Sequence, residues 1–290
     1  MEYAIEVEKL VKRYGSFTAV HQLSFAVEEG EIFALLGANG AGKTTTLECI
    51  EGIRHYNGGK ISVKGKIGVQ LQSSSLPGTL TALEAFRLFC KWNRAKENLT
   101  LLKDFGVTEF KNKLYKSLST GQKRRLHLAI ALISAPDIIF LDEPTAGLDV
   151  EGRVSLHKEI KKLKEMGKTI LLASHDMAEV ENLCDRIAIL KEGKLAFLGS
   201  SRELTQTGFG ESRITLQTRN PFPARQLVNS RHIPTEQAES NRLTVATTDI
   251  GDALLELLTM LKEMDNDVLD IKLERASLEQ RFLEIAKEGK

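Results

Sequence analysis

Residues 32–47 read Ile-Phe-Ala-Leu-Leu-Gly-Ala-Asn-Gly-Ala-Gly-Lys-Thr-Thr-Thr-Leu, and this stretch decides the fold. An apolar run of strand length ends at Gly37, and the residues from Lys43 onward predict the first turn of a helix. The spacing of Gly37, Gly42, Lys43 and Thr44 is that of a phosphate-binding loop. In such a loop the glycines let consecutive N–H groups face phosphate oxygens, and the helix dipole adds positive charge there. The stretch therefore predicts a site for a nucleoside triphosphate.

Two side chains of the loop match the charges of such a ligand. The Lys43 ammonium can reach the β- and γ-phosphates, and the Thr44 hydroxyl can ligate Mg²⁺. Tyr14 lies just upstream of the loop. Its ring would stack on adenine or would simply occupy an edge strand, and the residues alone leave both roles open.

The composition is that of a globular protein with one large domain or two. The chain has 290 residues, of which 42% are hydrophobic and 27% charged. Its net charge of +1 gives no electrostatic reason to expect nucleic acid as a partner. Cys49, Cys90 and Cys184 lie far apart without metal-ligand spacing, so we expect reduced thiols. The N-terminus lacks a signal-peptide pattern and no apolar run is long enough to span a bilayer, so we expect a soluble polypeptide that reaches a membrane through a partner.

A second buried strand carries two acidic residues at its end. Residues 138–141 are apolar and are followed by Asp142 and Glu143. Because ligands of open α/β sheets bind at the carboxyl ends of strands, Asp142 is placed to hold Mg²⁺. Glu143, on the other side of the pleat, is placed to orient or deprotonate a water that attacks the γ-phosphate. The alternative is two solvated acids that end a strand.

Two further motifs have both a structural and a functional interpretation. Ser119 and Gln122 have the spacing of a capping box, which predicts a helix start and explains the pattern without a ligand. Residues 169–174 predict another buried strand, with His175 at its end. A histidine there caps or packs against the strand, or it contacts a γ-phosphate, because it falls at the same sheet edge as Glu143.

The remaining pattern places these motifs on a succession of strands and helices. Helical periodicity over residues 81–115 predicts an insert of two or three helices that separates the two halves of the nucleotide site, and Gly106 fits the C-cap of one of these helices. Pro136 is expected to break the helix that starts at Ser119. Other expected elements are strands at 3–11, 17–27, 61–63, 66–69 and 185–190, a turn at 12–16, and a basic helix at 151–166.

The order of these motifs resembles that of the nucleotide-binding subunits of ABC transporters. The resemblance covers residues 3 to about 200, and its most specific part is Leu-Ser-x-Gly-Gln at residues 118–122, which separates ABC proteins from other phosphate-loop ATPases. It implies an α/β fold at residues 1–204: a phosphate-loop ABC ATPase core with a mixed, largely parallel sheet, an antiparallel β subdomain and a helical subdomain at about 73–135.

The resemblance also implies roles for individual residues. Tyr14 matches the aromatic residue that stacks on adenine, and Gln72 matches the glutamine that contacts Mg²⁺ and the attacking water. The implied catalytic residues are Lys43, Gln72, Glu143 and His175; the implied metal ligands are Thr44, Gln72 and Asp142; and the implied phosphate loop comprises Asn39, Gly40, Ala41, Gly42, Lys43, Thr44 and Thr45.

In the family two such domains enclose two ATP molecules head to tail. Ser119, Gly121 and Gln122 would then serve the ATP of the opposite subunit, and Asp149 would cross the interface. The implied activity is hydrolysis of ATP with Mg²⁺ as cofactor. The implied partners are a second ATPase subunit, identical or paralogous, and a separate polytopic permease that holds the chain at the cytoplasmic face of the cell membrane.

Thr120 departs from the family pattern, which most often has glycine at this position. A β-branched residue is stiffer than glycine and disfavours positive φ, so we expect closure or turnover to be altered rather than lost.

The last part of the chain predicts a small α+β domain at residues 205–290. Residues 199–210 are rich in Gly, Ser and Thr and indicate a linker. The residues at 276–284 resemble the tail of drug- and polysaccharide-exporter ATPase subunits, which favours an exporter. The expected elements are strands at 213–216, 242–245 and 268–273 and helices at 250–264 and 277–286.

The surface around Gln72 and the helical insert, including Leu76-Pro77 and Phe86-Phe89, is the expected docking site of the permease. The competing hypothesis is a soluble ABC ATPase that acts in translation, DNA repair or iron–sulfur assembly. Translation-type members carry two copies of the motif set and repair-type members a long heptad insertion, neither of which occurs here. The assembly type usually lacks a C-terminal appendage.

Overall fold

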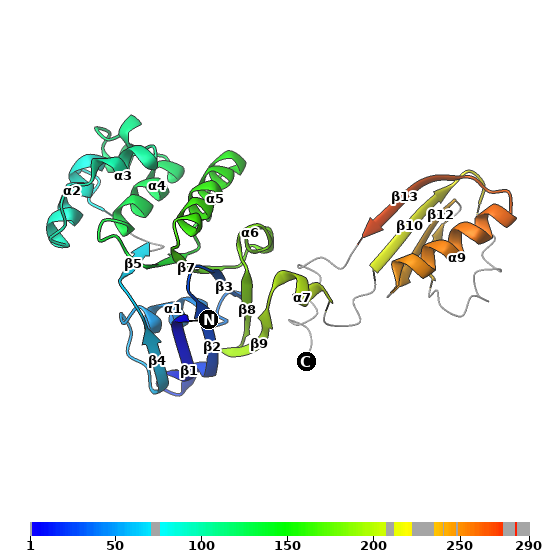
Figure 1. Cartoon of the computed structure of the whole chain (residues 1–290), viewed down its shortest axis with the longest axis horizontal. Helices are drawn as coiled ribbons and strands as arrows, with labels where there is room; N and C mark the ends of the chain where they lie inside the picture. Colours follow the sequence, from blue (N-terminus) through cyan, green and yellow to red (C-terminus); the bar gives the residue numbers. More distant parts are fainter. Residues whose placement is uncertain are drawn as a thin grey trace. The chain divides into compact units, whose positions relative to one another are not determined.

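The computed structural model describes residues 2–70, 76–206, 212–221, 235–239, 241–247, 249–274 and 282. The chain divides into two units, Met1–Ser201 and Arg202–Lys290, each of which is described by itself (Figure 1). The segment expected to be a linker, residues 199–210, contains a short helix, α7 (Ser201–Gln206), so it is not entirely irregular. Leu204 of this helix is buried, which explains why the segment is ordered there.

The first unit is built on a six-stranded sheet. Its order is β5 (Ile67–Gln70), β6 (Ile138–Asp142), β7 (Thr169–Ser174), β3 (Ile32–Leu36), β8 (Arg186–Lys191) and β9 (Lys194–Gly199). The first five strands are parallel, and β9 pairs antiparallel to β8. All residues of β3 and β7 are buried, as expected for central parallel strands covered on both faces. The carboxyl ends of β3, β6 and β7 therefore meet at one edge of the sheet.

A three-stranded antiparallel sheet packs against this core. Its order is β2 (Phe17–Glu28), β1 (Tyr3–Tyr14) and β4 (Gly58–Val63). Helix α1 (Lys43–Ile50) lies between the two sheets, and its Leu47 and Ile50 join side chains of both in one hydrophobic core. The expected turn at 12–16 is wrong in extent, because β1 continues to Tyr14 and pairs with Phe17. Gly15 supplies the positive φ of 58° that so tight a turn requires.

The helical insert consists of α2 (Ala82–Trp92), α3 (Leu99–Asp104), the 3₁₀ turns η1 (Val107–Glu109) and η2 (Tyr115–Ser117), and α4 (Thr120–Ala131). Helix α2 starts with a capping box between Thr81 and Glu84, and Gly106 ends α3 with a φ of 62°, as predicted. Helix α4 ends at Ala131, before Pro136, so the proline does not set its end. Ala135, at a φ of 48°, turns the chain instead. The last two helices of the unit are α5 (Val150–Glu165) and α6 (Met177–Leu183).

The second unit is a small α+β domain, as predicted. Its antiparallel sheet has the order β11 (Thr235–Glu239), β12 (Arg242–Thr247), β10 (Ser212–Thr218) and β13 (Val268–Glu274). Helix α9 (Ile250–Glu263) covers one face of this sheet (Figure 1), and its Leu257 packs with Ile214 and Val245. Strand β11 has a weak apolar pattern and was not predicted. The helix predicted at 277–286 lies outside the described residues, apart from Phe282.

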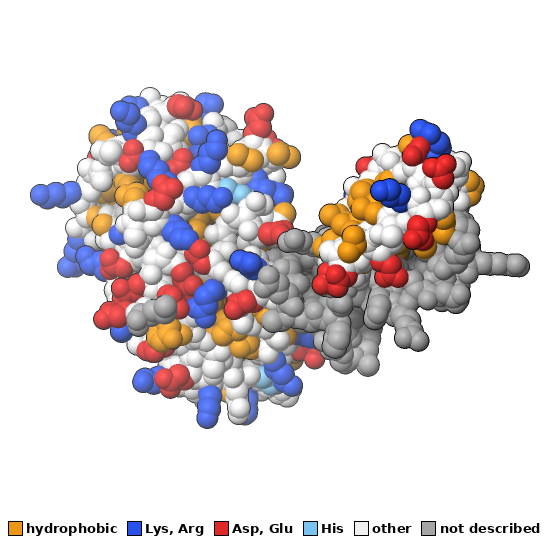
Figure 2. All heavy atoms as spheres, turned by 45° about the vertical axis from the view of Figure 1, so that its right-hand side comes forward, with side chains coloured by type: hydrophobic (Ala, Val, Ile, Leu, Met, Phe, Trp, Pro, Cys, Tyr) orange, Lys and Arg blue, Asp and Glu red, His pale blue; other side chains and the backbone are white. Residues whose placement is uncertain are grey.

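Together these elements confirm the predicted fold class. Among the described residues no helix is both long and apolar enough to cross a membrane. Figure 2 shows acidic and basic side chains interspersed over the visible face of the first unit, in agreement with the net charge of +1. One expected surface residue is misassigned: Phe86 is fully buried, so it cannot contact a docked partner.

This difference within α2 gives a test of the fold. Phe86 is 0% exposed, whereas Trp92 on the same helix is 78% exposed. We expect Phe86→Ala to lower the free energy of unfolding by about 3–5 kcal/mol through lost burial and a cavity. The matched Trp92→Ala change should cost less than about 1 kcal/mol. Urea denaturation followed by circular dichroism measures both, and equal losses would contradict the assignment of Phe86 to the core.

Candidate nucleotide site

The loop between β3 and α1 has the geometry of an anion cradle. Gly40 and Gly42 have φ values of 83° and 99°, which L side chains rarely adopt. A Cβ atom on Gly37 would lie 2.6 Å from the Leu190 carbonyl oxygen, so this glycine is required by close backbone contact. No side chain caps the start of α1, whose N-cap residue is Gly42. The N–H groups of its first turn are therefore presented to a bound anion.

Lys43 lies at the centre of the site. Its side chain is 6% exposed, and Nζ donates a hydrogen bond to the Gly37 carbonyl oxygen at 2.8 Å. Nζ also lies 3.9 Å from Oε1 of Glu143. Burial lowers the pKa of Lys43, and the carboxylates of Glu143 and Asp142 oppose that shift. A buried ammonium held by loop carbonyls is suited to binding phosphate oxygens.

Asp142 and Thr44 form an oxygen-rich corner beside Lys43. Thr44 Oγ1 donates a hydrogen bond to Asp142 Oδ2 at 3.1 Å. The other oxygen, Oδ1, is buried and has no hydrogen-bond partner. Burial raises the pKa of Asp142, and the hydrogen bond from Thr44 opposes this rise. A carboxylate with an unsatisfied oxygen next to a hydroxyl fits the hard-oxygen preference of Mg²⁺.

These two residues alone would not complete a metal site. Within the described part of the chain there is no group of three or more His, Cys, Asp or Glu that could hold a metal ion. Mg²⁺ usually keeps several waters and binds through one or two protein ligands together with substrate phosphates. The corner formed by Thr44 and Asp142 therefore fits a metal that arrives with a nucleotide.

Glu143 follows β6 in a strained conformation. Its φ is 49°, and its N–H donates to the Ala173 carbonyl oxygen at 2.9 Å. The sequence predicted that Glu143 would continue the pleat of β6. Instead, Glu143 turns the chain where the strand ends. A non-glycine residue in this region costs about 1–3 kcal/mol, and such residues cluster at functional sites. The turn places the buried carboxylate between Lys43 and His175, whose Nδ1 hydrogen-bonds with Glu143 Oε2 at 2.7 Å. The His175 side chain is 59% exposed, so this pair borders solvent.

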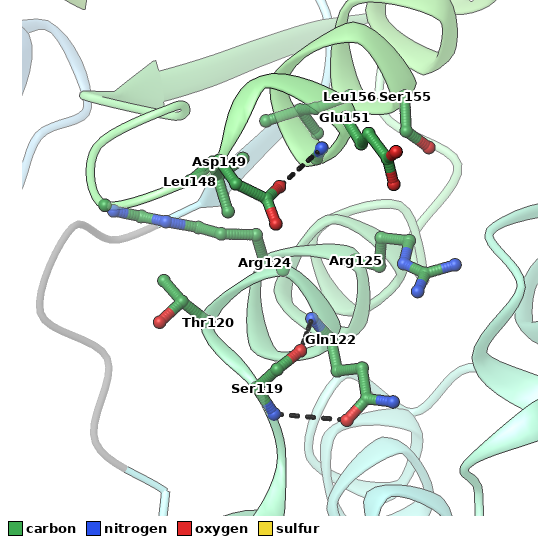
Figure 3. A pocket seen from close by; sticks show the side chains of 13 residues that line it. Ser119, Thr120, Gln122, Arg124, Arg125, Leu148, Asp149, Glu151, Ser155 and Leu156 are labelled. Atoms are coloured by element: carbon green, nitrogen blue, oxygen red, sulfur yellow. Dashed lines mark hydrogen bonds between the residues drawn. The ribbon is translucent and has the colours of Figure 1, made fainter.

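A second cluster surrounds a pocket of about 500 Å³ between the starts of α4 and α5. Ser119 and Gln122 form the predicted capping box of α4 through reciprocal hydrogen bonds of 3.2 and 3.1 Å. Asp149 caps α5 by accepting a hydrogen bond from the Gly152 N–H at 2.8 Å. Figure 3 shows Ser119 and Gln122 at the start of one helix and Asp149 at the start of the other. Two helix N-termini thus face one polar pocket.

Thr120 lines the same pocket as the first residue of α4. It is not among the residues with positive φ, so a β-branched side chain is accommodated in ordinary helical geometry. The expected conflict between threonine and a left-handed backbone is therefore absent at Thr120. Its Cγ2 atom would lie 3.6 Å from a Cβ on Gly147.

The structure brings the predicted residues into two groups. Lys43, Thr44, Asp142, Glu143 and His175 form the first, and Ser119, Gly121, Gln122 and Asp149 line the pocket, which includes none of the first group. Asn39 and Gly40 are exposed at the outer side of the loop, whereas Ala41 is buried and Thr45 half-buried. Gln72 lies outside the described residues.

Tyr14 stands apart from both groups. Its ring is 40% exposed, and two cations lie near it, with Lys12 Nζ at 4.9 Å and the Arg54 guanidinium carbon at 5.4 Å from its centroid. An exposed aromatic ring with cations nearby is a suitable platform for a base that carries phosphates.

Sequence reasoning missed several polar residues that support the site. Arg124 is buried, and its Nη2 reaches the Ala146 carbonyl oxygen at 3.5 Å, which links α4 to the turn after Glu143. Gln70 donates to the Arg124 carbonyl oxygen at 3.3 Å. Glu51, Glu179 and His157 are further examples. Their only sequence signal is a single polar residue within or at the end of a helix or strand.

Known proteins resemble this chain in sequence and in structure. The sequence profile of the family described as ABC transporter matches residues 20–146. The linearmycin resistance ATP-binding protein LnrL of Bacillus subtilis is 30% identical over 97% of both chains. The chain belongs to the ATP-binding proteins of ABC transporters. This confirms the resemblance drawn from the motifs, and supports a transport-coupled role over the soluble alternative.

Two further comparisons agree with this family. The Nod factor export ATP-binding protein I of Burkholderia orbicola is 36% identical, with 76% of this chain and 79% of that protein covered. The dimeric structure of a post-hydrolysis ATP-binding cassette bound to ADP and Pi has a TM-score of 0.62 and 27% identity, and covers 68% of this chain and 98% of that one.

Glu51 gives a test of the electrostatics beside this ABC site. Burial, together with the negative charges of Asp142 and Glu48, raises the pKa of Glu51 to about 7. The folded state therefore binds the proton more tightly than the unfolded state, whose pKa is near 4.5. The stabilisation of the folded state by protonated Glu51 is fully present below the unfolded-state pKa of 4.5, and it is lost as pH rises through the folded-state pKa of about 7. We expect Glu51→Gln to flatten the fall in melting temperature between about pH 5 and pH 8.

The exposed Glu165→Gln change serves as the control, because it removes an acid without altering this buried cluster. Differential scanning fluorimetry over the pH range measures all three proteins. If the Glu51→Gln curve runs parallel to that of the wild type, the raised pKa is refuted.

Proposed function

We propose that this chain hydrolyses MgATP and powers export through a separate membrane permease. The observation that carries the proposal is the buried Glu143 carboxylate, held between Lys43 and His175 and next to the Asp142–Thr44 corner. A base, a phosphate-binding cation and a metal corner at one sheet edge are the parts that phosphoryl transfer to water requires.

Binding is assigned to the loop and its flanks. The backbone and side chains of residues 39–45 hold the phosphates, and Tyr14 stacks on adenine. Thr44 and Asp142 hold Mg²⁺, with Gln72 as a further ligand. Mg²⁺, when bound, neutralises charge on the phosphate oxygens.

Hydrolysis is assigned to Glu143. Its carboxylate orients a water molecule and accepts a proton from it as the water attacks the γ-phosphate. His175 hydrogen-bonds to the same carboxylate and contacts the γ-phosphate from its exposed side. Lys43 stabilises the charge that spreads over the phosphate oxygens in the transition state. The products are ADP and phosphate.

The second group of residues points to a dimer. Ser119, Gly121, Gln122 and Asp149 line a pocket that includes no residue of the first group. We assign this pocket to the ATP of an opposing subunit, identical or paralogous, in a head-to-tail pair. A helix N-terminus with a serine hydroxyl suits a γ-phosphate from across an interface. The dimeric form of the solved cassette bound to ADP and Pi supports this arrangement.

Export rests on the relatives. Two of them are named for linearmycin resistance and for Nod factor export, which supports an outward direction. The chain would act at the cytoplasmic face of the cell membrane, bound to a polytopic permease.

Replacing Glu143 tests the proposed chemistry. We expect Glu143→Gln to lower kcat for ATP hydrolysis at least about 100-fold, because the amide cannot accept the proton from water. Nucleotide affinity should stay within about threefold, because the phosphate loop is unchanged. Phosphate release and fluorescent-nucleotide titration measure the two quantities, and turnover close to the wild-type rate would refute the assignment.

Pull-down with the same variant tests the proposed partner. With ATP present, the Glu143→Gln chain should stay in the closed dimer and retain a polytopic protein from native membranes. A chain found only in soluble complexes would refute the transporter role.

The docking surface can be tested on α2. With Phe86 buried, the exposed apolar residues of this helix are Leu88 and Trp92, the latter stacked on Phe89 at 6.1 Å. We expect Leu88→Glu to reduce the membrane-bound fraction about tenfold, because a charge would be buried in the interface. Basal ATPase activity of the purified chain should not change.

Lys91→Glu is the matched control, since Lys91 is exposed on the same helix and the change also adds negative charge. Sedimentation of cell membranes followed by immunoblotting gives the fraction. Unchanged membrane binding of Leu88→Glu would exclude this surface.

A further inference from the structure

Glu179 on α6 is a fully buried carboxylate that the assigned chemistry does not use. Its Oε2 accepts a hydrogen bond from Ser174 Oγ at 2.6 Å. Ser174 Oγ in turn accepts a hydrogen bond from the Asp176 N–H at 3.0 Å. The residue between these two is His175. The hydroxyl bridge therefore fixes the backbone on both sides of the histidine that contacts Glu143.

The same carboxylate also contacts the turn after Glu143. The Thr145 side chain, which is 5% exposed, lies beside the Glu179 carboxylate and stabilises its charged form. The turn is closed by the Ala146 N–H to the Glu143 carbonyl oxygen and the Leu148 N–H to the Thr145 carbonyl oxygen. Glu179 thus holds the two segments that carry His175 and Glu143.

The remaining oxygen of Glu179 faces α5. Oε1 of Glu179 and Nε2 of His157 lie 3.9 Å apart, and both atoms are buried without a hydrogen-bond partner. Helix α5 begins at Asp149, which lines the pocket of the second cluster. These two polar atoms face each other but lie too far apart for a hydrogen bond.

Among the described residues, no cation lies closer to the Glu179 carboxylate than His157. Burial raises the pKa of Glu179 and lowers that of His157. The titratable or charged groups that interact with the pair from the neighbouring elements are Asp176, Glu143, Arg124, Arg153, Lys161 and Cys184. Of the cations, Arg153 forms an ion pair with Asp176 at 2.9 Å.

We propose that Glu179 is a positioning residue for hydrolysis: through Ser174 and the neighbouring Thr145 it holds His175 and Glu143 in position. It touches neither substrate nor metal. This inference rests on the proposed ATPase activity of the chain. We infer that kcat for ATP hydrolysis depends on the hydrogen-bond acceptor of the Glu179 side chain rather than on its volume.

The test compares variants of the full chain in steady-state ATP hydrolysis. Glu179→Leu keeps the volume but removes the acceptor, and Ser174→Ala removes the donor. We expect each to lower kcat about tenfold or more with KM for ATP within about twofold, since small displacements of reacting groups reduce the rate while the phosphate loop is intact. Glu179→Gln keeps an acceptor for Ser174 and should recover kcat to within about threefold of wild type. The exposed Glu181→Gln on the same helix is the control and should leave kcat unchanged.

Melting temperatures recorded for each variant separate positioning from stability. A purely structural role would lower the melting temperature and leave kcat unchanged well below it, and this result would overturn the proposal. Should Glu179→Leu fail to fold, Ser174→Ala carries the test alone, and a kcat within about twofold of wild type would overturn the proposal. A wild-type chain without ATPase activity would overturn the proposed function and this inference with it.

Discussion

The parallel pairing of β6, β7 and β3 is the constraint on which the site depends. Leu36 pairs with Ser174, and Asp142 pairs with Ala173, so three strands end within about one residue of each other. A slip of one residue would move every side chain of a strand to the other face and disrupt the close packing on both faces of β3 and β7, which are completely buried. The apolar packing of these strands therefore fixes the positions of the polar residues at and just beyond their carboxyl ends.

Several buried or partly buried charged groups lie at this edge of the sheet. Lys43 is held by loop carbonyls and stands 3.9 Å from Glu143, while one oxygen of Asp142 has no partner. Unsatisfied buried polar atoms are costly in a folded protein, and the free oxygen of Asp142 lies in the corner that we assign to Mg²⁺. Glu143 is also strained at this edge, because its hydrogen bond to Ala173 of β7 imposes a φ that the residue alone would avoid.

Sequence reasoning was most successful where a local pattern has a single physical solution. The phosphate loop was predictable because its glycine spacing permits few backbone paths, and the capping box at Ser119 because its two hydrogen bonds are local. Strands β3, β6 and β7 followed from their uninterrupted apolar runs. The family motifs added roles for residues such as Tyr14 that spacing alone left open.

The errors have a common origin in contacts that are distant in sequence. Periodicity placed Phe86 on a helix but did not reveal which side faces the core, and the surface assignment failed. The end of β1 was missed because its pairing with β2 overrides the turn propensity of residues 12–14. Glu143 was expected to follow the pleat, whereas its hydrogen bond to Ala173 occurs in a left-handed turn. The supporting contacts of Arg124 and Glu179 were not predicted, because a single polar residue in a helical sequence does not reveal which residues it contacts.

Helix caps lie beside both groups of residues that we propose to bind ATP. Ser119, Asp149 and Asp176 each begin a helix by accepting a backbone N–H, and each stands next to a residue group assigned to ATP. Capping needs one oxygen lone pair of the side chain, which leaves the remaining capacity for a ligand or a neighbouring segment. Asp176 uses this capacity for Arg153 of α5, and Ser174 next to it connects to α6. The cap at Asp176 therefore joins α6 to α5 through Arg153, and Ser174 joins the end of β7 to α6, so both helices are anchored beside His175 and the Glu143 carboxylate that it contacts.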